Sequence, residues 1–139
     1  WLIKQRSHWS DAYLMVQKEM AERLTGKVGT KAYSRLTVMI GAFMDVKICF
    51  NISPNVFIPI PKVESSIIRL VKKPKPLIRD NQFKQFEKIV RSAFSQRRKM
   101  LRNSLKEFNF HLKIQEEIDF RRRPETLLIQ EFVKLLQNR

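Results

Sequence analysis

The stretch Val46-Lys47-Ile48-Cys49-Phe50-Asn51-Ile52 decides the fold of the first half of this chain. Its apolar residues recur at every second position, which is the period of a strand with one face against a core. Residues 63–71 have the same strand character and follow a loop that contains Pro59 and Pro61. We therefore predict two neighbouring antiparallel strands joined by an unusually stiff connection.

On the N-terminal side of this hairpin, residues 12–16 form a short continuous apolar run, typical of a strand that is covered on both faces. The pattern of residues 19–24 is helical, and Gly26 is placed to end that helix. Residues 33–44 predict a second helix that is largely buried. Strand, helices and hairpin together indicate the edge of an α/β sheet, so the fold class expected for residues 1–71 is α/β.

On the C-terminal side, Pro74 and Pro76 lie in a lysine-rich segment, where they remove backbone donors and favour extended conformations. We predict a linker over residues 72–79 and a small all-α domain over residues 80–139, with Asp80 capping its first helix. Apolar side chains recur with a helical period at Phe83, Phe86, Ile89, Val90, Ala93 and Phe94. The pattern continues at Leu101, Leu105 and Phe108. After Pro124, the apolar side chains on one face are Leu127, Leu128, Phe132, Leu135 and Leu136.

Charge is the strongest compositional feature of the chain. Its 139 residues include 28 Lys and Arg against 13 Asp and Glu, a formal net charge of +15, and two thirds of that excess lies after residue 70. The hydrophobic fraction of 43% predicts a folded protein, because a chain this apolar can bury a core. A charge of this size is best tolerated where a polyanion neutralises it, so nucleic acid is the first candidate partner.

Cys49 is the single cysteine, which excludes a disulfide framework and a cysteine-based zinc site and suits a reducing compartment. No apolar run reaches the roughly 18 residues of a membrane span, and the N-terminus has no secretory leader pattern. We expect a soluble, cytoplasmic protein without membrane contact. The chain opens on Trp1 without an initiator Met, so we expect a fragment whose true start lies upstream.

The densest group of cations lies in residues 95–103, Ser-Gln-Arg-Arg-Lys-Met-Leu-Arg-Asn, which we place inside a helical stretch. A helix surface with this charge can follow RNA or DNA phosphates, and few acidic residues compensate it; a solvated charged surface is the alternative. Residues 121–123, three consecutive arginines, form a weaker second patch. The candidate phosphate-binding cations in and near the first stretch are Lys88, Arg91, Arg97, Arg98, Lys99, Arg102 and Lys106.

Phe57 stands in the proline-rich loop between the two predicted strands. Pro59 and Pro61 restrict this loop, so an aromatic ring presented there has little conformational entropy left to lose. Such a ring can stack on an unpaired base, a contact worth about 1 to 3 kcal/mol. Alternatively, Phe57 caps the core beneath the hairpin, and composition by itself favours this second interpretation.

Residues 17–24 follow the first predicted strand, and open α/β sheets bind ligands beyond the carboxyl ends of their strands. A salt-bridged helix surface explains the same residues equally well. The three glycines, Gly26, Gly29 and Gly41, do not form a turn that could cradle a nucleotide cofactor, and no spacing suits a metal ion. Both histidines are isolated, so we do not expect catalysis by this chain alone.

Five stretches of the chain, in this order, resemble the small-subunit ribosomal RNA adenine dimethyltransferases of the KsgA type. They are residues 17–24, residues 29–36, residues 57–65, residues 93–105, and Arg123-Pro124-Glu125-Thr126-Leu127 ahead of Phe132. The similarity covers nearly the whole chain, and its third and fourth motifs are the most specific.

The resemblance implies a Rossmann-like methyltransferase whose S-adenosylmethionine site and Asn-Leu-Pro-Tyr type motif would lie upstream of Trp1. Residues 1–71 would then be the far edge of the catalytic sheet, and residues 80–139 a helical RNA-binding domain, inactive alone. The implied reaction transfers two methyl groups to each of two adjacent adenines near the 3′ end of small-subunit (16S) RNA during ribosome biogenesis. Phe57 would stack on the target adenine, and Lys62 would steer phosphate.

The same resemblance implies the 30S pre-ribosomal particle as the partner of a monomeric enzyme. A hypothesis from a different class is a non-catalytic RNA-binding or ribosome-assembly module, since the basic domain is complete and no cofactor site is visible. A third hypothesis is a relative that acts on large-subunit RNA or in mitochondrial DNA transcription. Residues 95–103 resemble the small-subunit branch of the family instead.

Overall fold

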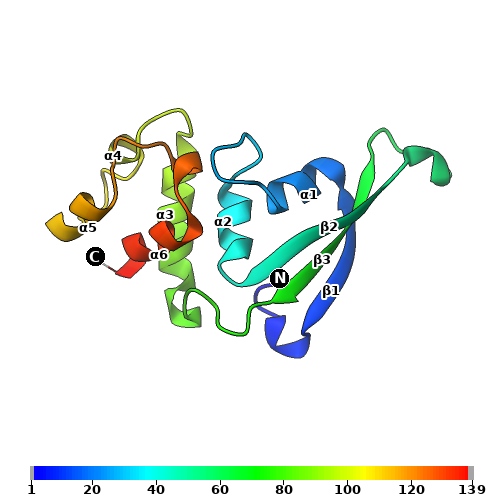
Figure 1. Cartoon of the computed structure of the whole chain (residues 1–139), viewed down its shortest axis with the longest axis horizontal. Helices are drawn as coiled ribbons and strands as arrows, with labels where there is room; N and C mark the ends of the chain where they lie inside the picture. Colours follow the sequence, from blue (N-terminus) through cyan, green and yellow to red (C-terminus); the bar gives the residue numbers. More distant parts are fainter. Residues whose placement is uncertain (1, 138–139) are drawn as a thin grey trace.

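Three strands form one antiparallel sheet in the computed structural model, which describes residues 2–137 (Figure 1). They are β1 (Asp11–Gln17), β2 (Met44–Ile52) and β3 (Ser65–Lys72), and their spatial order is β1-β3-β2. The pairing of β2 with β3 confirms the predicted hairpin, and β1 pairs with the other side of β3. β3, the last strand in sequence, is therefore the central one.

β1 is confirmed as a strand, but the expectation that both its faces are covered is wrong within the described residues. Its side chains alternate: Leu14 and Val16 pack against the core, whereas Tyr13 is 61% exposed and Met15 56% exposed. An apolar run does not reveal which of its side chains point toward a core, because the sheet can leave one face open to solvent.

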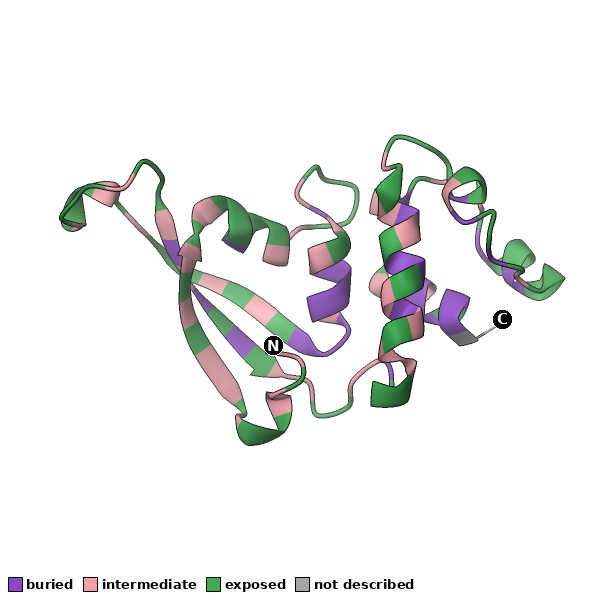
Figure 2. Cartoon of the chain, turned by 180° about the vertical axis from the view of Figure 1, so that it is seen from behind, coloured by how far each residue is buried: buried purple, intermediate pink, exposed green. Residues whose placement is uncertain are grey.

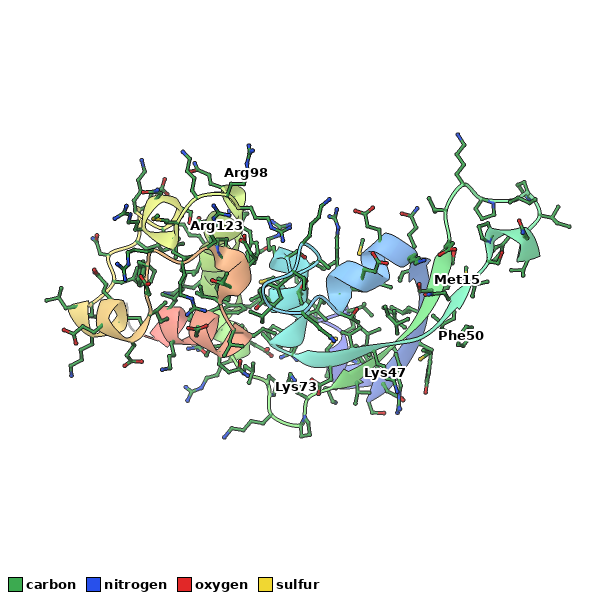
Figure 3. The ribbon with its side chains drawn as sticks, turned by 45° about the horizontal axis from the view of Figure 1, so that its top comes forward. Met15, Lys47, Phe50, Lys73, Arg98 and Arg123 are labelled. Carbon is green, nitrogen blue, oxygen red and sulfur yellow. The ribbon has the colours of Figure 1, made fainter. Side chains whose placement is uncertain are left out.

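The open face of the sheet carries an apolar row across all three strands. Met15 pairs with Ile67, and Ile67 pairs with Phe50, which is 59% exposed (Figure 3). A bulge between Ile48 and Phe50 produces this alignment, since the extra residue Cys49 moves Phe50 to the open face.

Two short helices cover the opposite face of the sheet. α1 (Lys18–Leu24) agrees with the prediction, while α2 (Arg35–Gly41) is shorter than the predicted residues 33–44. α2 starts after Ser34, which forms a capping box with Thr37, and it ends before Met44 enters β2. As predicted, most of this helix is buried.

Gly26 does not end α1 by adopting a left-handed conformation, since Gly29 is the glycine with a positive φ among the described residues (84°). Its role is close approach: a Cβ atom at Gly26 would lie 2.7 Å from the backbone of Ala32 and of Tyr33. The glycine therefore lets the loop fold back on itself after the helix.

The chain after β3 forms helices and turns. The longest element is α3 (Phe83–Ser95), whose residues Phe86, Ile89, Val90 and Ala93 are buried as predicted. The others are α4 (Leu101–Ser104), α5 (Leu112–Glu117), α6 (Ile129–Gln137) and the short 3-10 turns η3 (Asp80–Gln82) and η4 (Pro124–Thr126); two further 3-10 turns, η1 (Arg6–His8) and η2 (Pro54–Val56), lie earlier in the chain. None of these helices has the length and hydropathy needed to span a bilayer.

Two details of this half differ from the sequence-based expectation. Asp80 forms an ion pair with Arg6, and α3 begins three residues later, after η3, so Asp80 does not cap it. Leu128 is 52% exposed, whereas Leu127 is fully buried, because Leu128 lies immediately before α6 and turns outward.

The helices of the second half pack directly on the first half. The buried residues of both halves belong to one hydrophobic cluster, and Figure 2 shows them concentrated where α2 and α3 face each other. Gly41 lies against Ile129, because a Cβ atom there would be 2.4 Å from the Ile129 side chain. The N–H of Gly29 also donates to the carbonyl of Glu125 at 2.8 Å.

Candidate nucleic-acid interface

The carboxyl end of β1 borders a cleft of 290 Å³, lined by Gln17, Lys18, Glu19, Glu22, Val63 and Glu64. Lys18 forms an ion pair with Glu64, and its backbone N–H donates to the Glu64 carbonyl at 3.0 Å. The hydrogen bond to Glu64, together with its charge, raises the pKa of the Lys18 ammonium. Residues 17–24 therefore lie beside a cleft and are also salt-bridged, so each interpretation of them describes part of the structure.

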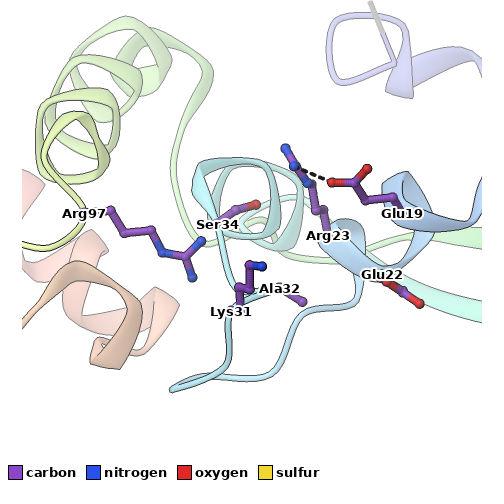
Figure 4. A pocket seen from close by; sticks show the side chains of 7 residues that line it. All are labelled: Glu19, Glu22, Arg23, Lys31, Ala32, Ser34 and Arg97. Carbon is purple, nitrogen blue, oxygen red and sulfur yellow. Dashed lines mark hydrogen bonds and ion pairs between the residues drawn. The ribbon is translucent and has the colours of Figure 1, made fainter.

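A second cleft, of 410 Å³, continues along α1 and shares Glu19 and Glu22 with the first (Figure 4). Its other lining residues are Arg23, Lys31, Ala32, Ser34 and Arg97. Arg97 reaches it from beyond the end of α3, and its Nη2 donates to the carbonyl of Thr30 at 3.0 Å. The second cleft therefore lies between the two halves of the molecule, and Arg97 joins them.

A third cleft, of 390 Å³, is formed by the consecutive residues Ser95, Gln96, Arg97, Arg98 and Lys99. It shares Arg97 with the second cleft. The second cleft therefore adjoins both of the others, and the three form a line of neighbouring depressions from the chain before β3 to the turn after α3. We name residues 96–99 the basic turn.

The prediction that residues 95–103 lie inside a helix is wrong. α3 ends at Ser95, whose Oγ donates to the carbonyl of Ser92 at 2.7 Å. The chain then turns, with the Lys99 N–H donating to the Gln96 carbonyl at 2.8 Å, and it becomes helical again only at α4. Three of the four cations in this stretch thus lie on a turn, where their side chains are not confined to one helical stripe.

The chain just after the basic turn adjoins the second arginine patch. The backbone N–H of Leu101 donates to the carbonyl of Arg122 at 2.9 Å, so the three consecutive arginines run beside the start of α4. Figure 3 shows Arg98 and Arg123 near each other in the second half of the molecule. Two patches that are about 25 positions apart in sequence therefore form one surface.

Several cations of this surface are already neutralised. Arg121 pairs with Asp119 at 3.1 Å, and Arg122 pairs with Glu131 at 2.5 Å. Among residues 2–137, the exposed cations of this surface without an acidic partner are Arg98, Lys99, Arg102 and Arg123. These side chains can bind phosphates without breaking an internal ion pair.

Lys88 and Arg91 extend the charged surface along α3. Both are exposed, and their spacing of three residues places them on the same side of the helix, before the basic turn. The Lys88 ammonium lies 5.7 Å from the centroid of the Phe108 ring, a cation–π contact. Lys88 is therefore held close to the segment that follows α4.

The loop that carries Phe57 projects from the far ends of β2 and β3, away from the helices (Figure 1). Phe57 is half-buried, yet it is not one of the residues that pack against the hydrophobic cluster. Its neighbours Val56 and Ile58 are 67% and 100% exposed, and Lys62 is also exposed. The structure therefore places Phe57, Pro59, Pro61 and Lys62 together in one loop, whose base lies at one end of the line of clefts. The predicted arginines and lysines lie at the other end.

The three glycines have local structural roles and do not form a ligand-binding turn. Gly26 and Gly41 allow close approach, and Gly29 occupies a left-handed position in the loop before α2. The described residues also contain no group of three or more His, Cys, Asp or Glu side chains arranged to hold a metal ion.

The fold is that of the edge of a Rossmann-like methyltransferase. A solved structure of a dimethyladenosine transferase from Plasmodium falciparum matches 96% of this chain and 58% of its own chain, with a TM-score of 0.82 and 30% identity. The class of protein defined by the fold is thus a methyltransferase.

Two curated relatives narrow this class, and both are named "Ribosomal RNA small subunit methyltransferase A". The protein from Flavobacterium johnsoniae is 46% identical over 123 residues, which are 88% of this chain and 47% of the relative. The protein from Clostridium botulinum (strain Kyoto / Type A2) is 41% identical over 140 residues, covering 96% of this chain and 51% of the relative. The ribosomal RNA adenine dimethylase model matches residues 1–135, and the chain belongs to this family. The chain spans about half the length of the curated relatives it matches.

Proposed function

We propose that this chain is the RNA-holding and target-base side of an enzyme that dimethylates two adjacent adenines near the 3′ end of small-subunit ribosomal RNA. Membership of the ribosomal RNA adenine dimethylase family supports the class of reaction. One observation supports assigning base stacking to the Phe57 loop and RNA-backbone binding to the basic turn. It is the line of three clefts, which runs from the base of the Phe57 loop to the basic turn. One RNA strand can lie along this line and contact both ends.

Phe57 stacks on the target adenine in this proposal. The exocyclic amine of adenine is a poor nucleophile because its lone pair is delocalised into the ring, so the base must leave its stack and be held in a fixed orientation. A half-buried aromatic ring on a protruding loop provides one face for the base, and Pro59 and Pro61 limit the loop's motion. Lys62, exposed on the same loop, contacts a neighbouring phosphate.

The basic turn and its surroundings hold the RNA backbone. Arg98, Lys99 and Arg102 contact phosphates directly, and Lys88 and Arg91 extend that contact along α3. Arg97 has a double role, because its guanidinium donates to the Thr30 carbonyl and also lines two of the clefts. The helical residues 80–139 act as the RNA-binding domain, and residues 72–79 connect it to the sheet.

S-adenosylmethionine is the methyl donor in this proposal, and it is bound by the part of the family's proteins that this chain does not span. The chain alone is then inactive, and its own residues supply base stacking and RNA contact. The partner is the 30S pre-ribosomal particle, and the enzyme acts as a monomer.

The test uses the longer protein that includes the upstream coding sequence, with Phe57→Ala compared with Ile58→Ala, its fully exposed neighbour. We expect Phe57→Ala to lower the rate of methyl transfer to small-subunit RNA about 10- to 100-fold, as the loss of one stacked base predicts. RNA affinity should stay close to that of the wild type, and Ile58→Ala should behave as the wild type in both measurements.

Two outcomes oppose the proposal in different ways. An active longer protein in which Phe57→Ala keeps the wild-type rate would remove the stacking role. A longer protein without a glycine-rich motif upstream and without methyl transfer would favour the non-catalytic RNA-binding module.

A further inference from the structure

The segment that connects the sheet to α3 borders two open clefts. Their volumes are 630 and 270 Å³, and they share Arg6, Pro76 and Asp80. The cations that line them come from the N-terminal turn and from the connecting segment: Lys4, Arg6, Lys72, Lys73, Lys75 and Arg79. We name this group of residues the linker patch.

The linker patch carries a net positive charge. Arg6 is paired with Asp80, and Lys73 is paired with Asp45. Among the residues that the structure describes, the other four cations have no acidic partner, so the patch with its two aspartates has a formal charge of +4. A solvated charged surface usually intersperses both signs, and here the acidic residues are already engaged.

The backbone beneath these cations is fixed. The N–H of Lys72 donates to the Ser10 carbonyl, that of Lys73 to the Phe43 carbonyl, and that of Leu77 to the Ala42 carbonyl, each at 2.9 Å. Prolines at positions 74 and 76 restrict the segment further. A ligand that binds here therefore orders the lysine and arginine side chains and not the chain itself, which lowers the entropic cost of binding.

The linker patch and the line of clefts lie at opposite edges of the molecule. β1 separates them, because Asp11 at its start pairs with Val71 beside the linker, while Gln17 at its end lines the first cleft. Seven residues of strand span about 20 Å. Figure 3 shows the same separation, with Lys73 and Arg98 at opposite edges.

The chemistry of the linker patch suits a polyanion better than a protein. A protein partner is usually anchored by exposed aromatic or large apolar side chains. Here Ile78 is buried and Leu77 is packed against the hydrophobic cluster, so the exposed residues that line the clefts are polar or charged residues and prolines.

We propose that the linker patch is a second, separate RNA-phosphate site, which binds a different segment of the ribosomal RNA from the one that lies along the clefts. This inference rests on the proposed function, namely that the chain binds ribosomal RNA. Lys75 and Arg79 are its best probes, because both are exposed and neither forms an ion pair among the described residues.

The test measures the binding of the full chain to a small-subunit RNA fragment by fluorescence anisotropy over a series of salt concentrations. The variant Lys75→Ala/Arg79→Ala is compared with Lys47→Ala/Lys113→Ala, which removes the same charge from two exposed residues outside both sites. We expect the first variant to bind at least tenfold more weakly, with a log-log salt slope lower by roughly 1.4 to 1.8, and the control to bind within twofold of the wild type.

An RNA hairpin of about four base pairs, which is shorter than the roughly 20 Å between the sites, distinguishes two sites from one. It can occupy either surface but cannot reach both, so Lys75→Ala/Arg79→Ala should change its affinity less than threefold. Equal weakening on the short and long RNA would overturn the proposal of a separate site, as would a variant that binds the long RNA like its control. A loss of affinity in Arg98→Ala/Lys99→Ala tests the proposed function independently, because those residues belong to the other edge.

Discussion

The hydroxyl of Tyr33 donates a hydrogen bond of 2.7 Å to the backbone carbonyl of Leu127, 94 positions further along the chain. Both residues are buried, so this bond joins the loop before α2 to the segment before α6 in the middle of the core. Burial, with a smaller effect of the Glu131 charge, raises the pKa of Tyr33, so the hydroxyl stays protonated and remains a donor.

The substitution Tyr33→Phe should destabilise the fold by about 1 to 3 kcal/mol, because it leaves the buried Leu127 carbonyl without this donor. Urea denaturation monitored by circular dichroism measures the change. The other tyrosine provides the matched control, since Tyr13 is 61% exposed and Tyr13→Phe should change the free energy of unfolding by less than about 0.5 kcal/mol. Equal stability of the two variants would show that the Tyr33 bond does not contribute.

The start of α6 contains half of a capping box. The carboxylate of Glu131 accepts a hydrogen bond of 2.7 Å from the N–H of Leu128, but leucine cannot return a bond to the helix. Leu128→Ser would complete the box and should raise the free energy of unfolding by about 1 kcal/mol. Leu128→Ala, measured in the same denaturation series, controls for the loss of an exposed apolar side chain and should give no such gain.

The pair of Arg122 and Glu131 predicts a dependence of stability on pH. Burial tends to raise the pKa of Glu131, but the hydrogen bonds from Arg122 and Leu128 outweigh it, and the pKa lies below its ordinary value of 4.5. A carboxyl with a depressed folded-state pKa stabilises the fold above the unfolded value, and this contribution is lost as the pH falls through the folded value.

Glu131→Gln should therefore be less stable than the wild type near neutral pH, and the difference should shrink as the pH falls below 4.5. Thermal unfolding at a series of pH values measures it. Glu116→Gln, on the exposed surface of α5, should show a much smaller difference at every pH. A gap for Glu131→Gln that is constant with pH would contradict the role of the charge.

The basic turn predicts how RNA affinity depends on salt. Arg98→Ala/Lys99→Ala should lower the log-log slope of affinity against salt by roughly 1.4 to 1.8. Arg97→Ala should act differently, because it also removes the hydrogen bond to the Thr30 carbonyl and so lowers stability as well as affinity. Filter binding with small-subunit RNA measures the affinity of these variants, and denaturation measures their stability. An unchanged salt slope in Arg98→Ala/Lys99→Ala would exclude the basic turn from the RNA interface.

Local patterns predicted much of the secondary structure of this chain. Alternation in residues 46–52 identified β2, and the period of apolar residues identified α3, because both signals come from neighbouring positions that face the same core. The end of α3 could not be predicted in this way. The apolar period continues at Leu101 and Leu105 beyond the end of α3, so the pattern contains no signal for the turn at residues 96–99.

The candidate site was predictable in composition but not in arrangement. The sequence indicated the Phe57 loop and the cations after α3 as separate features, whereas the clefts that connect them are formed by α1 and the loop before α2. Lys31 and Glu64 line those clefts; both belong to stretches singled out by resemblance, residues 29–36 and 57–65, but the sequence did not indicate that they lie along one row of clefts. The linker patch was also missed, because Lys4 and Lys75 come together only when the chain folds.

The bulge at Cys49 has a consequence for how this protein tolerates changes in length. Deleting Cys49 would remove the bulge and restore regular alternation in β2, with Phe50 directly after Ile48 and still opposite Ile67 on the open face. Deleting any other residue inside the paired part of β2 would instead turn one side of the strand over to the wrong face. The loop between β2 and β3 lies outside the paired register. One-residue deletions should therefore be accepted near Phe57 and at Cys49, and rejected at Val46 to Ile48.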